Sequence, residues 1–322
     1  MTDGFGRKAE YLRISLTDRC NIRCGYCMPP GGVRSLSHDQ ILTLEETARI
    51  AHVMKTAGIR KVRLTGGEPL IRKNIGELLR MLGAMSFPDG VYITTNATLL
   101  RDKLDEIVEA GIAGINISLD TLRPETFCFL TGVDLLQEVI AAVDEAYKTG
   151  IRIKLNCVPI EGINDDELID IAGYAKDRNI DVRFIELMPI GCAVNYTGVP
   201  SSKILADLSN VYGKPIQRKE DAVSSPAVMY DLPEFTGGIG FISPMSAPFC
   251  SSCNRLRLTS EGFLKLCLEK PDGIDLKTLI RQGISDDELK TVIEKAVMQK
   301  RAAHDLNRAS ASEQRKMVQI GG

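Results

Sequence analysis

The chain has 322 residues, of which 44% are hydrophobic and 25% charged, so it can bury the core of one large domain or of a large and a small one. Its 40 basic and 42 acidic side chains leave a net charge of −2, which excludes an overall electrostatic attraction to nucleic acid or to an anionic membrane. We see no apolar signal sequence and no apolar run of about 18 residues that could span a membrane. Nine cysteines without such a signal favour a cytoplasmic, metal-binding protein.

The predicted elements alternate between strand and helix along the first two thirds of the chain. Strands are expected at 11–17, 61–65, 91–95, 114–119, 151–158 and 181–187, and helices at 43–57, 75–85, 99–109, 135–148 and 165–177. The first helix opens with a capping box, Thr43 to Glu46. Gly58, Gly111, Gly150 and Asn179 each precede an apolar residue where a helix should end in the left-handed conformation.

This alternation predicts parallel strands joined by right-handed crossovers. The fold class is therefore α/β, and six such units suggest an incomplete (β/α)6 barrel. The pattern alone leaves an open doubly wound sheet as the alternative.

The predicted strands carry a polar face, which is unusual for buried parallel strands. The helices must cover the apolar face, so the polar face should line a lumen that can bind a ligand. An antiparallel sheet with one wet face would explain the alternation but not the helices. The residues expected in the lumen are Arg13, Ser15, Thr17, Arg63, Thr65, Asn116, Ser118, Asp120, Lys154 and Asn156.

Three cysteines follow the first strand within one short loop. Three residues separate Cys20 from Cys24 and two separate Cys24 from Cys27. Zinc sites favour Cys-x-x-Cys pairs with a second pair further on, whereas Fe–S clusters use closely spaced thiolates, normally one per iron. Three thiolates on a four-iron cluster would leave one iron open to a substrate or cofactor.

After residue 191 the alternation is expected to stop, and 210–322 should form a C-terminal extension over the open side of the barrel, leaving 1–209 as the partial barrel. A second trio, Cys250, Cys253 and Cys267, brackets a hairpin-like segment. Its spacing fits half a zinc ribbon or a second cluster with an open iron. Arg255 and Arg257 share one face of that hairpin and suit an anionic ligand, above all a phosphate. Cys128 and Cys157 are expected in the core.

The Cys-x-x-x-Cys-x-Tyr-Cys loop and the run Thr65-Gly-Gly-Glu-Pro69 resemble motifs of the radical S-adenosylmethionine (SAM) enzymes. Together with Thr94-Thr-Asn96, the second trio around Asn-Arg-Leu-Arg, and the Gly321-Gly322 end, they are similar to the GTP 3′,8-cyclase family, which makes the first intermediate of molybdenum cofactor (molybdopterin) synthesis. The extra Cys192, in a segment where many relatives carry tryptophan, departs from that pattern.

The resemblance implies a radical SAM barrel with two [4Fe–4S] clusters and SAM as cofactors. SAM cleavage would give a 5′-deoxyadenosyl radical that removes the 3′ hydrogen of GTP, after which the sugar radical attacks C8 to give 3′,8-cyclo-7,8-dihydro-GTP. Cys20, Cys24 and Cys27 would hold the first cluster and Cys250, Cys253 and Cys267 the second. SAM would contact Tyr26, Gly67, Ser118 and Met188. GTP would contact Arg13, Arg63, Thr94, Lys154, Arg255 and Arg257. Catalysis would further depend on Gly321 and Gly322.

The implied partners are GTP, an electron donor and the downstream cyclic pyranopterin monophosphate synthase. No nucleic acid or membrane is expected as a partner, and the protein would be a monomer or a homodimer. Two alternatives remain at this point. One is a peptide-modifying radical SAM enzyme, which should carry a leader-binding domain and more C-terminal cysteines. The other is a non-enzymatic zinc-ribbon-like binding module, which does not account for the polar lumen.

Overall fold

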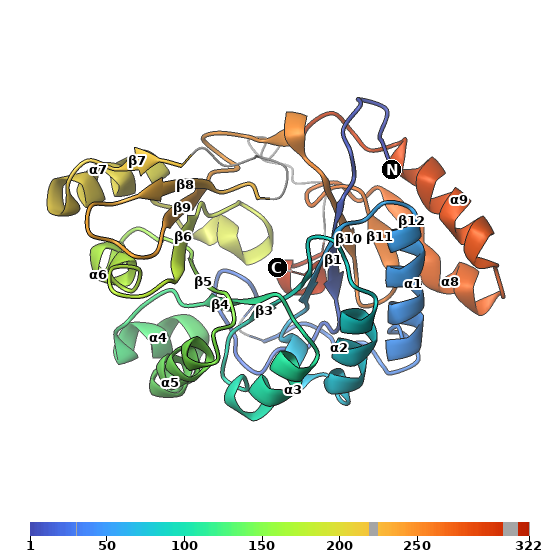
Figure 1. Cartoon of the computed structure of the whole chain (residues 1–322), viewed down its shortest axis with the longest axis horizontal. Coiled ribbons are helices and arrows are strands. Elements are labelled where there is room, and N and C mark those ends of the chain that lie inside the picture. Colours follow the sequence, from blue (N-terminus) through green and yellow to red (C-terminus); the bar gives the residue numbers. More distant parts are fainter. Residues whose placement is uncertain (30, 219–224, 305–314, 322) are drawn as a thin grey trace.

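A computed structural model describes residues 1–29, 31–218, 225–304 and 315–321. Its centre is one curved, twelve-stranded sheet in the order β12-β11-β10-β1-β2-β3-β4-β5-β6-β9-β8-β7. The sheet bends into an open barrel with helices on its convex side (Figure 1). The predicted α/β partial barrel is therefore confirmed, and the open doubly wound sheet was wrong.

Six parallel strands and their helices make up the barrel wall. The strands are β1 (Tyr11–Ser15), β2 (Lys61–Thr65), β3 (Val91–Thr95), β4 (Gly114–Ser118), β5 (Ile153–Cys157) and β6 (Asp181–Ile185). The helices between and after them are α1 (Leu44–Thr56), α2 (Ile75–Ala84), α3 (Leu104–Glu109), α4 (Pro124–Thr131), α5 (Leu136–Lys148), α6 (Leu168–Gly173) and α7 (Ser201–Tyr212), with 3-10 turns η1 (Pro69–Ile71), η2 (Arg101–Lys103) and η3 (Gly191–Asn195).

The C-terminal part of the chain extends both edges of this sheet. At one edge β9 (Ile239–Ile242) pairs parallel with β6 and antiparallel with β8 (Val228–Asp231), which pairs with β7 (Ile216–Gln217). At the other, β10 (Arg255–Leu258) pairs parallel with β1 and antiparallel with β11 (Phe263–Lys265), next to β12 (Gly273–Asp275). Helices α8 (Leu276–Arg281) and α9 (Asp286–Val297) and the 3-10 turns η4 (Cys250–Ser252) and η5 (Met317–Gln319) complete the described elements.

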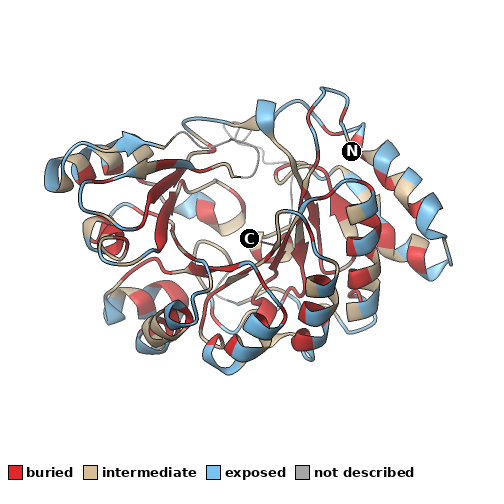
Figure 2. Cartoon of the chain, viewed as in Figure 1, coloured by how far each residue is buried: buried red, intermediate tan, exposed pale blue. Residues whose placement is uncertain are grey.

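The apolar face of each strand packs under the helices, as predicted. Leu12, Ile14, Val62, Leu64 and Ile115 are fully buried in the main core cluster, and Figure 2 shows buried residues along the sheet and on the inner faces of the helices. Because successive side chains of a strand point to opposite faces, the polar side chains between them face the concave side.

Three of the four predicted helix ends are confirmed. Gly58, Gly111 and Gly150 have φ values of 105°, 68° and 75°, a left-handed conformation that glycine adopts without steric cost. The fourth was wrong, because Asn179 has no positive φ among the described residues. The capping box between Thr43 and Glu46 is present at the start of α1.

Several sequence predictions of helices were wrong. Helices α4 and α7 were missed, and β9 continues the parallel order, so the alternation does not stop at residue 191. The helix expected at 165–177 is confined to α6, because Asn164 and Asp165 side chains accept backbone N–H groups of Ile160 and Gly162 and hold a turn there. The helix expected at 99–109 begins as η2 and becomes α-helical only at α3.

The two isolated cysteines differ. Cys157 is buried as predicted, but Cys128 is exposed, since α4 turns Phe127 inward and leaves its neighbours Cys128 and Phe129 on the outer side.

No single helix in the described ranges is long and apolar enough to cross a membrane; one pair, α4 with α5, reaches the required length and composition only together and is bent by 102°.

Candidate active site

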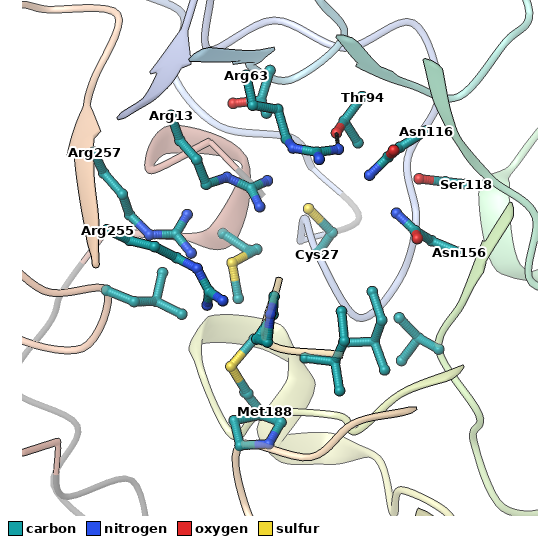
Figure 3. A pocket seen from close by; sticks show the side chains of 18 of the residues that line it. Arg13, Cys27, Arg63, Thr94, Asn116, Ser118, Asn156, Met188, Arg255 and Arg257 are labelled. Atoms are coloured by element: carbon teal, nitrogen blue, oxygen red, sulfur yellow. Dashed lines mark hydrogen bonds between the residues drawn. The ribbon is translucent and has the colours of Figure 1, made fainter. Parts of the chain in front are cut away.

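The concave face of the sheet encloses a cavity of about 530 Å³. All six cysteines of the two trios line it, as do all the described residues predicted to contact SAM or GTP. Figure 3 shows the guanidinium groups of Arg13, Arg63, Arg255 and Arg257 pointing into the same space as Thr94, Ser118 and Met188.

The two cysteine trios lie at opposite ends of this cavity. The loop with Cys20 follows the carboxyl end of β1, whereas Cys253 comes directly before the amino end of β10, which runs parallel to β1. Cys267 follows β11, which is antiparallel to β10 and so ends on the same side as Cys253. A strand of this length covers roughly 17 Å. The polar faces of the strands therefore line the whole distance between the two trios, and a ligand bound there would contact them.

The first trio fits a cationic iron–sulfur group. Burial raises the pKa of Cys24 well above its usual range, and Asp120 and the neighbouring thiols raise it further. Burial and Cys20 likewise raise the pKa of Cys27 to about 12. Three half-buried thiols that oppose one another's ionisation become a favourable set of thiolate ligands only when a positively charged metal group is present.

The loop that carries the first trio is supported by the two neighbouring motifs. The buried carboxylate of Glu68 accepts hydrogen bonds from the Asn96 backbone N–H (2.7 Å) and from the Thr95 hydroxyl (2.8 Å), and burial raises its pKa to about 7. The Asn96 amide in turn donates to Cys20 Sγ (3.7 Å). The Glu68 carboxylate therefore positions the loop through Asn96.

The glycines of the Gly-Gly-Glu-Pro run are explained by packing against this loop. A Cβ on Gly67 would lie 2.0 Å from the Arg19 carbonyl oxygen, and one on Gly66 would lie 2.8 Å from that of Thr17. The backbone N–H of Gly67 donates to the same Thr17 oxygen at 2.7 Å. The backbone at these two glycines therefore packs directly against the cysteine loop.

The residues predicted to contact SAM lie around the first trio at the carboxyl end of the strands. Gly67 follows β2, Ser118 ends β4, and Met188 follows β6. Tyr26 lies beside the trio and donates its hydroxyl to Asp120 at 2.6 Å. Sequence reasoning named Asp120 as lumen-facing but gave it no role.

The residues predicted to contact GTP form rows across neighbouring strands. Arg257, Arg13 and Arg63 are register partners on β10, β1 and β2. Arg255 lies one pleat away on β10, and Lys154 lies across the barrel on β5. Thr94 accepts from Arg63 Nη1 at 3.3 Å, whereas Thr95 is bonded to Glu68.

These buried cations repel one another. Burial, and then Arg257, lower the pKa of Arg13 well below its usual range, and burial and Arg255 lower that of Arg257 to about 10. Within the described ranges, buried N–H groups of Arg13 and Arg183 and the amide oxygens of Asn116 and Asn156 have no hydrogen-bond partner. A polyanion would relieve the repulsion and accept hydrogen bonds from the arginine N–H groups, whereas the two amide oxygens need a donor.

Lys154 shares its anionic partner with two arginines. Its Nζ lies 3.0 Å from Asp181 Oδ2, and Arg152 and Arg218 approach the same carboxylate at 3.4 and 3.6 Å. Burial, followed by Arg183, lowers the pKa of Lys154 to about 8.

The second trio is held by two buried cations from distant parts of the chain. Lys300 Nζ donates to the carbonyl oxygens of Arg255 (2.6 Å) and Leu266 (2.7 Å), and Arg7 donates to that of Cys250 (2.7 Å). Burial acts to raise the pKa of Cys253, but the Lys300 ammonium, the backbone N–H of Arg255 and the Arg255 guanidinium together outweigh burial, so the pKa is lowered. Thiolate ligands for iron are favoured in such an environment.

No three or more His, Cys, Asp or Glu side chains in the described part of the chain converge closely enough to hold a single metal ion. Zinc binds its thiolates at about 2.3 Å around one point, whereas the thiolates of a four-iron cluster bind separate irons and stand further apart.

The end of the chain reaches into the cavity region. Gly321 has φ 82°, and a Cβ there would lie 2.7 Å from Thr65 Oγ1. Its carbonyl oxygen accepts from Arg13 at 3.0 Å. Gly322 lies outside the described residues.

Sequence reasoning missed several cavity residues. Arg183 alternates with Val182 and Phe184 on β6, so the pattern that identified Arg63 could have found it. Lys61 is two residues before Arg63 and shares its face. No pattern indicated the roles of Tyr11, Tyr92 or Lys300. Cys192, which is part of η3, lies near Cys27 and does not belong to either trio.

Two family models together match most of the chain. The model described as Radical SAM superfamily matches residues 14–175, and the one described as Molybdenum Cofactor Synthesis C matches residues 180–306.

Curated relatives match over the full length. The chain is 43% identical over 326 residues to a GTP 3′,8-cyclase of Desulforamulus reducens and 40% identical over 323 residues to one of Clostridium perfringens, with 100% of both chains covered in each case. Among solved structures, Streptococcus suis SuiB bound to S-adenosylmethionine covers 97% of this chain and 77% of its own, with a TM-score of 0.66 and 15% identity, a likeness that shows the fold alone.

Proposed function

This chain belongs to the GTP 3′,8-cyclase family of radical SAM enzymes, and we propose that its cavity binds SAM at the carboxyl end of the barrel and GTP between the two cysteine trios. The family's reaction joins C3′ of GTP to C8 and is the first step of molybdenum cofactor synthesis. When bound, the first [4Fe–4S] cluster supplies the electron that cleaves SAM.

At the carboxyl end, Cys20, Cys24 and Cys27 hold the first cluster, and Tyr26, Gly67, Ser118 and Met188 contact SAM. Support for this assignment comes from their position around one end of the cavity. The Glu68 and Asn96 contacts keep the loop fixed while SAM exchanges.

At the amino end, Cys250, Cys253 and Cys267 would hold the second cluster, which would supply an iron able to bind the guanine. Arg13, Arg63, Thr94, Lys154, Arg255 and Arg257 bind the remainder of GTP, above all its triphosphate. This assignment is supported by the crowding of buried cations, because a triphosphate would offset the repulsion that lowers the pKa values of Arg13 and Arg257. Arg13 orients the tail through the Gly321 carbonyl, and catalysis depends on Gly321 and on Gly322, which lies outside the described residues.

The remaining assignments follow from the chemistry. We assign residues 1–209 to the SAM barrel and 210–322 to the second-cluster extension, a division that falls within α7. SAM cleavage needs an electron donor, and the cyclised nucleotide needs a following enzyme, cyclic pyranopterin monophosphate synthase. A cytoplasmic location suits nine cysteines, none of which is paired in a disulfide among the described residues.

The observation that carries the proposal is the pair of cysteine trios at opposite ends of one cation-lined cavity. The test is an anaerobic reaction of the iron-loaded protein with GTP, SAM and a reductant. We expect equal amounts of 5′-deoxyadenosine and cyclised GTP. Formation of 5′-deoxyadenosine with GTP left unchanged would contradict the proposal.

A further inference from the structure

Two tyrosines, one on each of the two strands beside β2, enclose the two cations of β2. Tyr11 on β1 is the register partner of Lys61, and Tyr92 on β3 is the register partner of Arg63. Lys61 Nζ lies 5.8 Å from the centre of the Tyr11 ring and 4.4 Å from that of Tyr92. The Arg63 guanidinium lies 5.8 and 5.4 Å from the same two rings. All four distances are within the range of cation–π attraction.

Tyr11 interrupts a row of cations, and Tyr92 ends the row of arginines beside it. In one row Tyr11 stands between Arg255 and Lys61, and the Arg255 guanidinium also lies 5.9 Å from its ring. In the next row, Tyr92 follows Arg63. Like charges directly opposite one another on a sheet are destabilising, so an aromatic ring in the row keeps neighbouring cations apart and attracts each of them.

The fold makes room for the second ring. Tyr92 is the register partner of Gly114 on β4, and a Cβ at Gly114 would lie 3.1 Å from a carbon of the Tyr92 ring. The absence of a side chain at Gly114 therefore lets the ring lie against the sheet beside Arg63.

Tyr11 has a contact that Tyr92 does not share. Its hydroxyl accepts a hydrogen bond from Arg63 Nε, while Nη1 of the same guanidinium donates to Thr94. Two contacts on two edges fix the plane of a guanidinium, and Figure 3 shows the group directed from β2 toward Thr94 inside the cavity. The Tyr11 ring is itself buried, with 5% exposed.

We propose that Tyr11 is a positioning residue of the triphosphate site, which with the Tyr92 ring holds Arg63 and Lys61 apart and directed into the cavity before GTP binds. This inference rests on the proposed binding of GTP by Arg63. It adds that the cations are preorganised by aromatic residues, so that GTP binding does not have to order them.

The test measures GTP affinity by calorimetry on the anaerobic holoprotein without reductant, so that SAM is not consumed. Tyr11→Phe keeps the ring and removes the acceptor of Arg63, and we expect the dissociation constant for GTP to rise about tenfold. In turnover the KM for GTP should rise while kcat changes little. Tyr92→Phe, which retains its ring, should have a smaller effect than Tyr11→Phe.

Tyr174→Phe is the matched control. Tyr174 stacks on Arg178 at 5.1 Å, as Tyr11 does on Arg63, but neither Tyr174 nor Arg178 lines the cavity. We expect its GTP affinity to equal that of the unmodified protein, with iron content and melting temperature unchanged.

A double-mutant cycle with Arg63→Ala decides between outcomes. If Tyr11 acts through Arg63, Tyr11→Phe weakens GTP binding in the parent and has no further effect in Arg63→Ala. An equal loss in both backgrounds, or no loss in the parent while Arg63→Ala weakens binding, overturns the inference and leaves the proposed function standing. Unchanged affinity in Arg63→Ala overturns both.

Discussion

The Arg13 guanidinium donates to the carbonyl oxygen of Gly321 at 3.0 Å, which joins the first strand to the end of the chain across 308 positions. Arg13 is also the register partner of Arg63 and Arg257, in the middle of the proposed GTP site. The tail is thus in contact with the residues expected to bind substrate.

Gly321→Ala should reduce conversion of GTP by at least about tenfold while leaving both clusters intact. The new Cβ would lie 2.7 Å from Thr65 Oγ1 and would oppose a φ of 82°. Gly283→Ala is the matched control, because Gly283 has φ 86° and an added Cβ would meet nothing within 4 Å. Deletion of Gly321 and Gly322 should have the same effect as Gly321→Ala. Product is quantified by chromatography after anaerobic reaction; a truncated protein that cyclises GTP at the normal rate would show that the tail is dispensable.

Anaerobic reconstitution should load about eight irons per chain, four for each trio. Cys24→Ala should lose about half of the iron and all SAM cleavage, whereas Cys253→Ala should lose about half of the iron and retain SAM cleavage without GTP conversion. Iron and sulfide analysis with a 5′-deoxyadenosine assay measures both. About four irons with one zinc in the parent protein would instead support a zinc ribbon at the second trio.

Lys154→Ala should weaken GTP binding and leave SAM binding nearly unchanged. A charge-assisted hydrogen bond contributes about 1.5–3 kcal/mol, or roughly ten- to a hundredfold in affinity. Lys103→Ala is the control, since Lys103 forms an ion pair with Glu106 at 2.7 Å outside the cavity. Calorimetry with each ligand measures the difference. If GTP affinity is intact in Lys154→Ala, the triphosphate does not lie at β5.

GTP binding should take up protons at about pH 8. Burial lowers the pKa of Lys61 and of Lys154 to about 8, so part of each lysine is neutral in the empty cavity. Burial would raise the pKa of Tyr11, but Arg63, Arg13 and Arg255 lower it to about 7. A triphosphate favours charged lysines and a neutral phenol, so it raises all three pKa values.

Affinity for GTP should therefore fall as pH rises from about 7 to about 9. Calorimetry in two buffers with different ionisation enthalpies measures the number of protons exchanged. Proton release on binding would contradict the predicted sign.

Lys300→Met should lower the iron content of the second cluster and spare the first. The variant removes the ammonium that donates hydrogen bonds to the carbonyl oxygens of Arg255 and Leu266. Each carbonyl left unsatisfied lowers the stability by about 1–3 kcal/mol. Lys295→Met, an exposed position on α9, is the control. Iron analysis and the electron paramagnetic resonance signal of each cluster distinguish the two sites. Equal loss from both clusters would indicate general unfolding.

The strands and much of the site were predictable because each depends on a short-range pattern. In β2, Val62 and Leu64 face the helices and Arg63 and Thr65 face the cavity, and this follows from the two-residue period alone. Gly58, Gly111 and Gly150 marked helix ends for an equally local reason, their freedom to adopt positive φ.

The errors arose where burial depends on packing partners. The sequence Phe127-Cys128-Phe129 looks uniformly apolar, yet α4 buries only Phe127 and exposes the other two. The missed helix α4 has Pro124 at its first position, which was a usable start signal.

The sequence by itself identified the residues that we propose carry the chemistry: two cysteine trios, the cations on alternate strand positions, and the glycines at the turns. Only the tertiary structure decided which of them meet. The pairing of β1 with β10 places Tyr11 between Arg255 and Lys61, and the return of the chain places Lys300 behind Cys253 and Gly321 beside Arg13. Local periodicity fixes the face on which a side chain lies, whereas strand order and register depend on the burial of the whole core and on contacts between segments far apart in sequence.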